Sequence, residues 1–286
     1  MTGRLAFGGF LLGGVLAMAL LADTFSPRDP LLQDLSAVAL APGDGHPLGT
    51  DALGRDVLAR ILHGARISLP VAAAAAILSS TIGLIIGLLA GTTGGPADRA
   101  LMRLVDVMLA FPTLALLLVL AALFRSDHPV ALVLLLGLTT WMPLARIVRA
   151  EAAALAQQGF FEAAVGLGAS PLRRALRHVA PNVLSTVVIA ATLLAGDVML
   201  MESGLSYLGL GVAAPTPTWG DMVREGMQDL SGSWWVAAFP GLVLALGVMA
   251  FNLVGDGLRD ALDPKLPALT RLRPGVPGRP RAATIS

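Results

Sequence analysis

Residues 67–90 read ISLPVAAAAAILSSTIGLIIGLLA and contain no charged side chain. A helix of about 20 apolar residues crosses the ~30 Å hydrocarbon core of a bilayer, so this stretch predicts a membrane-spanning helix. Lipid offers no partner to unpaired backbone groups, which favours a helix over an open strand. Five other stretches have similar length and apolar character: 5–22, 107–124, 130–148, 182–201 and 234–254. The sequence therefore predicts an all-α integral membrane protein with six transmembrane helices.

The composition agrees with lipid as the surrounding solvent. Of 286 residues, 55% are apolar and 14% are charged, and the mean hydropathy is +0.76. An average soluble protein has about 25% charged residues. Cysteine is absent, which excludes disulfides and thiolate metal sites. A formal net charge of +1 argues against a nucleic-acid partner.

The basic residues predict an orientation in the membrane. With the N-terminus in the cytoplasm, fourteen of the 20 Lys and Arg residues fall in inside segments and six in outside segments. An excess of positive charge is typical of cytoplasmic connections. We therefore expect both termini in the cytoplasm, outside loops at 23–66 and 202–233, and one long inside loop at 149–181.

The apolar stretch 5–22 has two interpretations. Arg4 followed by an apolar run is also typical of a secretory signal peptide. The run is longer than a usual signal core, which favours a retained helix. The chain then divides into 1–66 (first helix and extracytoplasmic loop), 67–264 (five-helix core) and 265–286, a proline-rich cytoplasmic tail predicted to be disordered.

The inside loop is predicted to form two short helices that meet at an elbow. Gly168 can take the left-handed conformation that ends the first helix. Ser170 can cap the second helix, and Pro171 suits its first position. Pro181 is expected to end that helix or to kink its entry into 182–201. Two readings remain open: a surface that another protein grips, or a hairpin whose arginines contact anionic head groups.

This loop resembles the EAA motif of ABC importer permeases. The resemblance rests on Glu162-Ala163-Ala164, three residues, Gly168, nine residues, and His178-Val179-Ala180-Pro181. The chain departs from the general pattern, which prefers Ile and Leu, at His178 and Ala180. Arg177-His178 followed by Pro181-Asn182 is nevertheless similar to the peptide-importer branch.

Further stretches resemble the C-type permease subunits of dipeptide and oligopeptide importers. They occur in family order over roughly residues 46–264. The quoted stretches are His46 to Asp51, Leu53 to Leu58, Gly64 to Leu69, Asp98 to Pro112, Leu205 to Gly211, Trp219-Gly220, Phe251 to Asp260 and Asp263-Pro264.

The resemblance implies a permease subunit in the plasma (inner) membrane of a prokaryote. It would pair with a homologous second permease, two ABC ATPase subunits and an extracytoplasmic substrate-binding protein. ATP and Mg would bind the ATPase subunits, which fits a chain whose single lysine, Lys265, lies in no Walker A loop. This chain would carry no cofactor, no metal and no catalytic residue. The residues expected to couple it to the ATPases are Phe161, Glu162, Ala163, Ala164, Gly168, Ser170 and Pro171.

The expected substrate is a di- or oligopeptide, with nickel or another small solute as the alternative. Asp197 is the one acid well inside a predicted span, where it either lines the translocation pathway, pairs locally or extends toward the outer surface. A proton-coupled secondary transporter that uses Asp197, or a non-transport membrane scaffold, are the rival functions. No internal repeat supports the former.

Some residues are expected to be structural. Glycines spaced by four residues predict close packing between helices. They are Gly83, Gly87 and Gly91 in one predicted helix and Gly9 and Gly13 in another. A charge network is expected in the first outside loop, formed by Asp51, Arg55, Asp56 and Arg66. Trp219, Trp234 and Trp235 are expected to anchor the chain at the membrane interface.

Overall fold

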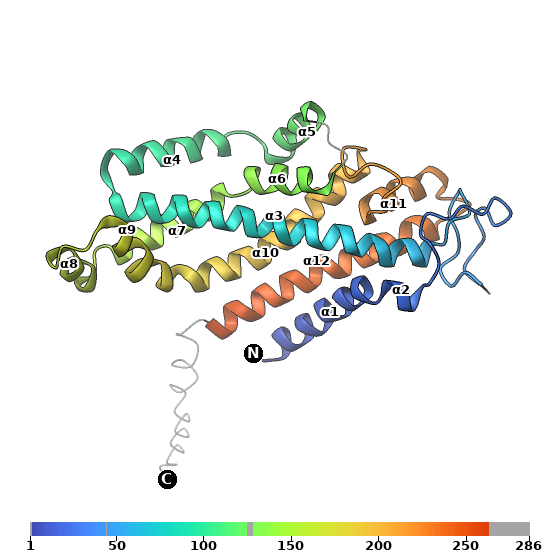
Figure 1. The fold of residues 1–286 in the computed structure, drawn as a ribbon, viewed down its shortest axis with the longest axis horizontal. Coiled ribbons are helices and arrows are strands. Elements are labelled where there is room, and N and C mark those ends of the chain that lie inside the picture. Colours follow the sequence, from blue (N-terminus) through green and yellow to red (C-terminus); the bar gives the residue numbers. More distant parts are fainter. Residues whose placement is uncertain (1, 44, 125–127, 263–286) are drawn as a thin grey trace, which may run out of the picture.

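The computed structural model describes residues 2–43, 45–124 and 128–262. Over these ranges the chain forms helices and no strand, apart from two isolated β-bridges in the loop before the second long helix. Figure 1 shows an elongated bundle whose long helices run side by side. The predicted tail, 265–286 with Lys265, lies outside the described residues.

Four long helices form the bundle: α1 (Thr2–Leu20), α3 (Val57–Thr93), α10 (Ala180–Tyr207) and α12 (Trp235–Leu262). Each is long and apolar enough to cross a membrane, α10 together with the turns before it. They overlap the predicted spans 5–22, 67–90, 182–201 and 234–254. Helix α3 begins ten residues earlier than predicted, because the Asp56 side chain accepts a hydrogen bond from the Ala59 amide at 2.9 Å and caps the helix.

The prediction of one continuous helix over 107–124 is wrong. Helix α4 (Gly95–Leu109) ends early, and α5 (Thr113–Leu123) leaves at an angle of 83°. Pro112 causes this break, since proline has no amide donor and disfavours helical backbone in the residue before it. The pair counts as one span only if the bend lies within the membrane.

The predicted span 130–148 is also broken, with a smaller bend of 44° between α6 (Pro129–Thr139) and α7 (Met142–Leu155). The hydroxyls of Thr139 and Thr140 donate to backbone carbonyls one turn earlier, at 2.6 and 2.8 Å. The described chain therefore has four continuous candidate spans, or up to six if each bent pair is one span.

Short elements lie at the two ends of the bundle. At one end, the elbow end, are α8 (Gly159–Gly166), α9 (Pro171–Arg174) and the π-helical turn η1 (Ala175–Val179). At the opposite end, the loop end, are residues 26–56 and α11 (Trp219–Gly226), which is followed by the 3₁₀ turn η2 (Met227–Asp229). The short α2 (Ala22–Phe25) follows α1.

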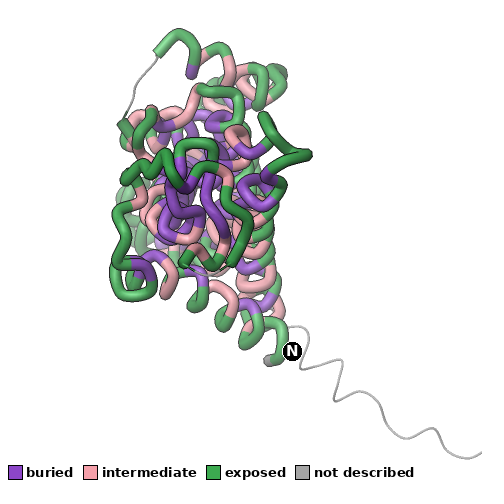
Figure 2. The backbone as a smooth tube through the Cα atoms, turned by 90° about the vertical axis from the view of Figure 1, so that its right-hand side faces the viewer, coloured by how far each residue is buried: buried purple, intermediate pink, exposed green. Residues whose placement is uncertain are grey.

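The core lies between α3, α7, α10 and α12. Figure 2, viewed from the loop end, shows buried residues in the centre of the bundle and exposed ones around it. The predicted packing of the second-helix glycines is confirmed, because a Cβ at Gly87 would lie 2.6 Å from the Cβ of Val148 on α7. On α1, a Cβ added at Gly9 or Gly13 would meet no described atom within 4 Å, whereas one at Gly8 would lie 2.8 Å from the Cβ of Leu253.

Candidate functional site

The elbow has the predicted backbone geometry. Gly168 has φ +74°, in the left-handed region. Its amide donates to the Val165 carbonyl at 2.9 Å, and the Ala169 amide donates to Ala164 at 3.0 Å. These two bonds form a Schellman motif, which satisfies the last carbonyls of α8. Ser170 then accepts from the Arg173 amide at 3.3 Å and caps α9.

One face of α8 is fixed to the bundle. Phe161 and Ala164, three residues apart, are both buried. Phe161 belongs to a core cluster with Val148 of α7 and Val183 of α10. The guanidinium of Arg174 lies 5.3 Å from the centre of the Phe161 ring, within the range of a cation–π contact. The aromatic ring thus ties α8 to the start of α10.

The opposite face of the elbow is exposed and largely apolar. Glu162 and Ala163 are exposed, and no ion pair or hydrogen bond of the Glu162 carboxylate occurs in the described part of the chain. Leu167, at the tip, is 88% exposed. The other exposed apolar side chains are Phe160, Val165, Leu172 and Leu176. A surface of this kind is typical of a protein-docking site.

The helix that follows the elbow does not end at Pro181. Of the two predicted outcomes, an end of the helix or a kink, the end is therefore wrong. The backbone passes from α9 through η1 into α10 without a break. The π-helical turn just before Pro181 accommodates the missing amide donor. The Asn182 side chain donates to the His178 carbonyl at 2.7 Å, one turn earlier. The elbow is therefore joined to α10 by continuous helix.

Asp197 does not belong to the elbow. It lies 17 residues after the start of α10, a distance of roughly 25 Å at 1.5 Å per residue. Its side chain is exposed, and it has no ion pair or hydrogen bond among the described residues. Local pairing within this chain is therefore not its role in the structure.

The predicted charge network is present at the loop end and extends further than predicted. Arg55 Nε and Arg60 Nη1 lie 2.7 and 2.6 Å from Asp51 Oδ2. Both arginines also contact Glu225 of α11, at 2.8 and 2.5 Å. Arg60 and Glu225 were not predicted as members. Glu225 is 170 residues from Arg55 and 165 from Arg60, and only the fold brings it to them.

Asp56 and Arg66 were predicted in the same network, but among the described residues each belongs to a separate group of ion pairs. Asp56 pairs with Arg28 at 2.8 Å, and Arg66 pairs with Asp23 at the same distance. Hydrogen bonds from Arg66 and His63 lower the pKa of Asp23. The pair of Arg55 with Glu225 joins the loop to α11, so residues 26–56 form a folded cap.

The interfacial role predicted for two tryptophans is wrong. Trp219 is fully buried, and its indole donates to the Ile61 carbonyl at 2.9 Å. Trp235 is also buried and donates to the Thr50 carbonyl at 3.1 Å. Trp234 is half exposed. The first two therefore join the loop cap to the core, because their indole donors find backbone partners there.

Sequence reasoning also missed Glu202, which is fully buried in α10. The Ser206 hydroxyl donates to its carboxylate at 2.9 Å, and the Ser203 hydroxyl lies 3.3 Å away. Ser206, at the fourth position after Glu202, was the available signal, since a helix places side chains four residues apart on the same face.

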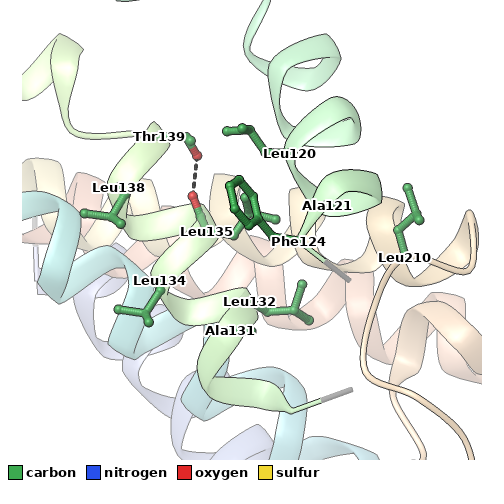
Figure 3. Close-up of a pocket in the computed structure, with 10 residues that line it drawn as sticks. All are labelled: Leu120, Ala121, Phe124, Ala131, Leu132, Leu134, Leu135, Leu138, Thr139 and Leu210. Atoms are coloured by element: carbon green, nitrogen blue, oxygen red, sulfur yellow. Dashed lines mark hydrogen bonds between the residues drawn. The ribbon is translucent and has the colours of Figure 1, made fainter. Parts of the chain in front are cut away.

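Two neighbouring cavities lie at the loop end. The first, of about 290 Å³, is an apolar groove between α5 and α6. Figure 3 shows Leu120 and Phe124 of α5 facing Leu132 and Leu135 of α6 across it. The second, of about 280 Å³, is lined by polar groups of α11 and by residues 209–214.

Comparison with known proteins gives concordant results. The profile of a family described as "binding-protein-dependent transport system inner membrane component" matches residues 83–267. The dipeptide transport system permease protein DppC of Bacillus subtilis (strain 168) is 38% identical over 265 residues, covering 92% of this chain and 82% of that protein. The di/tripeptide transport system permease protein DppC of Pseudomonas aeruginosa (strain UCBPP-PA14) is 38% identical over 267 residues, covering 89% and 88%. The oligopeptide transport system permease protein OppC of Haemophilus influenzae is 41% identical over 220 residues, covering 77% and 70%.

Proposed function

The chain belongs to the family of binding-protein-dependent transport system inner membrane components, and on that premise we propose that it is a C-type permease subunit of an ATP-driven peptide importer. The family is one of inner-membrane proteins. Relatives that share most of this chain's length are named for the transport of dipeptides, tripeptides or oligopeptides. The exposed elbow is the structural observation that supports the proposal most strongly.

In the proposed topology the chain crosses the membrane six times, with both bent helix pairs counted as spans. The elbow end and both termini lie in the cytoplasm, and the loop end lies outside. This topology divides the chain into three units: the first helix with its outside loop (1–66), the five-helix core (67–264) and the cytoplasmic tail (265–286). Fourteen of the 20 basic residues then face the cytoplasm, as the positive-inside rule favours.

The elbow is proposed to dock on an ATPase subunit. Glu162 and Ala163 present the exposed face of α8, while Phe161 and Ala164 attach that helix to the bundle. Gly168 sets the angle of the elbow, and Ser170 with Pro171 starts the helix that leads into α10. The exposed apolar tip around Leu167 would be covered by the partner.

The proposed complex contains this chain, a homologous second permease, two ABC ATPases and an extracytoplasmic binding protein. ATP and Mg bind the ATPases, and this chain performs no covalent chemistry. Closure of the ATPase pair on ATP moves the elbow, and the continuous helix from α9 to α10 carries that movement into the bundle. Shifting the equilibrium between two conformations of the bundle from 1:99 to 99:1 needs a difference of about 5.5 kcal/mol in binding free energy. Two docked ATPases can supply this difference.

Asp197 is proposed to face the translocation pathway. An exposed, unpaired carboxylate within a candidate span is unfavourable against lipid, so it is expected to meet water, substrate or the second permease.

The test is a pull-down of this chain, carrying an affinity tag, from detergent extracts of cells. These cells also express candidates for the second permease, the ATPases and the binding protein. Wild type is expected to capture an ATPase, whereas Glu162→Lys is expected to remain in the membrane but to lose the ATPase and peptide uptake. Asp29→Lys makes the same charge change on an exposed loop residue at the opposite end and serves as the control. Full uptake by Glu162→Lys would refute the coupling assignment.

A further inference from the structure

The polar cavity at the loop end is a candidate ligand site that the proposed function does not use. It is lined by residues 209–214, Ser206 and Ala121, and by the paired side chains of Asp221 and Arg224 on α11. Its volume of about 280 Å³ approaches the range of small-molecule sites, which begins near 300 Å³. Its lining combines a charged pair with a stretch of irregular loop made of bends and a turn.

The loop presents backbone groups without partners. The turn that ends α10 is complete, because the Leu210 amide donates to the Leu205 carbonyl at 2.8 Å. In contrast, no hydrogen bond within the described chain involves the backbone of residues 211–214, although Val212 is buried. Backbone groups at buried positions normally have a partner. A peptide main chain carries both amide donors and carbonyl acceptors, which are the partners that these backbone groups lack.

A guanidinium stands beside this free backbone. Arg224 is 38% exposed at its side chain, whereas Asp221 is 12% exposed. Arg224 Nε and Nη2 both donate to Asp221 Oδ1, at 3.0 and 2.5 Å, which fixes the orientation of the guanidinium and leaves Nη1 and the second Nη2 hydrogen for a ligand. These hydrogen bonds also raise the pKa of Arg224, so the group stays charged. The remaining guanidinium donors suit a carboxylate, the anion that arginine binds with two parallel hydrogen bonds.

The apolar groove of Figure 3 continues from the polar cavity. Ala121 and Leu210 line both spaces, so the two share a wall. Among the described residues, leucines and Phe124 wall the groove, and the one polar side chain that lines it, Thr139, donates to the Leu135 carbonyl. These described walls therefore offer an incoming group apolar contact.

We propose that these two cavities together form a subsite for the C-terminal end of a peptide, on the path from the loop end into the bundle. Arg224 binds the terminal carboxylate, residues 211–214 pair with the peptide main chain, and the groove between α5 and α6 receives an apolar side chain. This inference rests on the proposed function, since it names the part of the substrate that this chain recognises.

The absence of cysteine allows a direct test. A single reporter, Ala213→Cys, is placed in the polar cavity of the fully assembled importer in lipid nanodiscs, with Ala214→Cys as a second reporter. The rate of maleimide labelling of this chain is measured with and without the dipeptide Leu-Leu. We expect Leu-Leu to slow labelling of both reporters but not of Ser36→Cys, which lies on an exposed part of the loop cap.

The role of the guanidinium is tested by adding Arg224→Gln to each reporter. Loss of a charge-assisted pair is expected to raise the half-protecting concentration of Leu-Leu about tenfold. Leu-leucinamide, which lacks the carboxylate, should protect the unaltered cavity as weakly as Leu-Leu protects the Arg224→Gln cavity. Arg28→Gln is the matched control, because Arg28 is similarly exposed and pairs with a largely buried aspartate, Asp56.

The role of the groove is tested with Ala131→Phe, which fills it, and Ala122→Phe, which makes the same change on the exposed side of α5. Ala131→Phe should weaken protection by Leu-Leu and leave protection by Gly-Gly unchanged. Ala122→Phe should change neither.

Two failures are distinguishable. An importer that takes up Leu-Leu but shows no protection at either reporter, or equal protection by Leu-leucinamide, would overturn the subsite and leave the proposed function intact. An assembled complex that takes up no peptide, measured in proteoliposomes with its binding protein, would overturn the proposed function instead.

Discussion

Phe160 and Phe161 are adjacent in the sequence, yet the fold gives them different surroundings. Phe161 is buried in the cluster that joins α8 to α7 and α10, and Arg174 lies over its ring. Phe160 is 41% exposed on the outer face of the elbow. Phe161 therefore attaches the elbow to the bundle, whereas Phe160 lies on the face proposed to dock on the ATPase.

Phe161→Ala is expected to loosen α8. Truncation of a buried Phe costs about 3–5 kcal/mol locally, so amides 159–166 should exchange hydrogen faster, as measured by mass spectrometry in detergent. Phe160→Ala removes the same atoms from an exposed position and should leave this exchange unchanged. Equal exchange in the two variants would contradict the assignment of Phe161 as the anchor of α8.

Asp51 is the residue on which the loop cap depends. Its buried carboxylate holds Arg55 and the fully buried Arg60, and the Leu53 amide also donates to it at 2.8 Å. Asp51→Asn removes one partner of a buried charge cluster, which costs about 3 kcal/mol or more. Asp106→Asn breaks an exposed pair with Arg146 and should cost at most about 1 kcal/mol. Apparent melting temperatures in detergent should separate the two variants, and similar values would argue against a stabilising network.

At the scale of elements, the contact between α3 and α7 depends on a face of small residues. Cβ atoms at Gly87 and Gly91 would lie 2.6 Å from Val148 Cβ and from the Arg149 carbonyl. The two helices can therefore approach closely only while these positions lack side chains. A Cβ added at Gly9 or Gly13, the equally spaced glycines of α1, would meet no such neighbour in the described part of the chain.

Gly87→Leu is expected to force α3 away from α7. Overpacking of this kind costs about 1–3 kcal/mol or more, so the variant should lose thermal stability in detergent. Gly13→Leu, with nothing within 4 Å of the added Cβ, is the matched control and should melt like wild type. A stable Gly87→Leu protein would mean that the helices do not pack as described.

At the scale of the whole molecule, the elbow and the loop cap lie at opposite ends of one bundle (Figure 1). If the bundle crosses the membrane along its length, single cysteines at the two ends should react from opposite sides. Ser36→Cys should be labelled by a membrane-impermeant maleimide in intact spheroplasts, and Leu167→Cys only after lysis. Labelling of both from one side would contradict the proposed topology.

The sequence by itself determined the membrane class, the helical architecture and the local shape of the elbow. These features depend on composition, on apolar length and on the backbone preferences of Gly168, Ser170 and Pro171, all of which act over one or two turns of chain. Its ordered motifs also identified the family, through resemblance.

Only the tertiary structure decided the rest. Pro112 is a local signal for a break, but the 83° angle at that break depends on how α4 packs. Pro181 does not end its helix, because a π-helical turn accommodates it and α10 continues there. Trp219, Arg60 and Glu225 became core or network residues because packing brings segments more than 150 residues apart into contact. The cavity beside Arg224 also depends on contacts between distant segments. Its walls come from α5, from the end of α10 with residues 209–214, and from α11. Contacts between distant segments are set by how the whole chain packs, and for that reason they could not be read from the sequence alone.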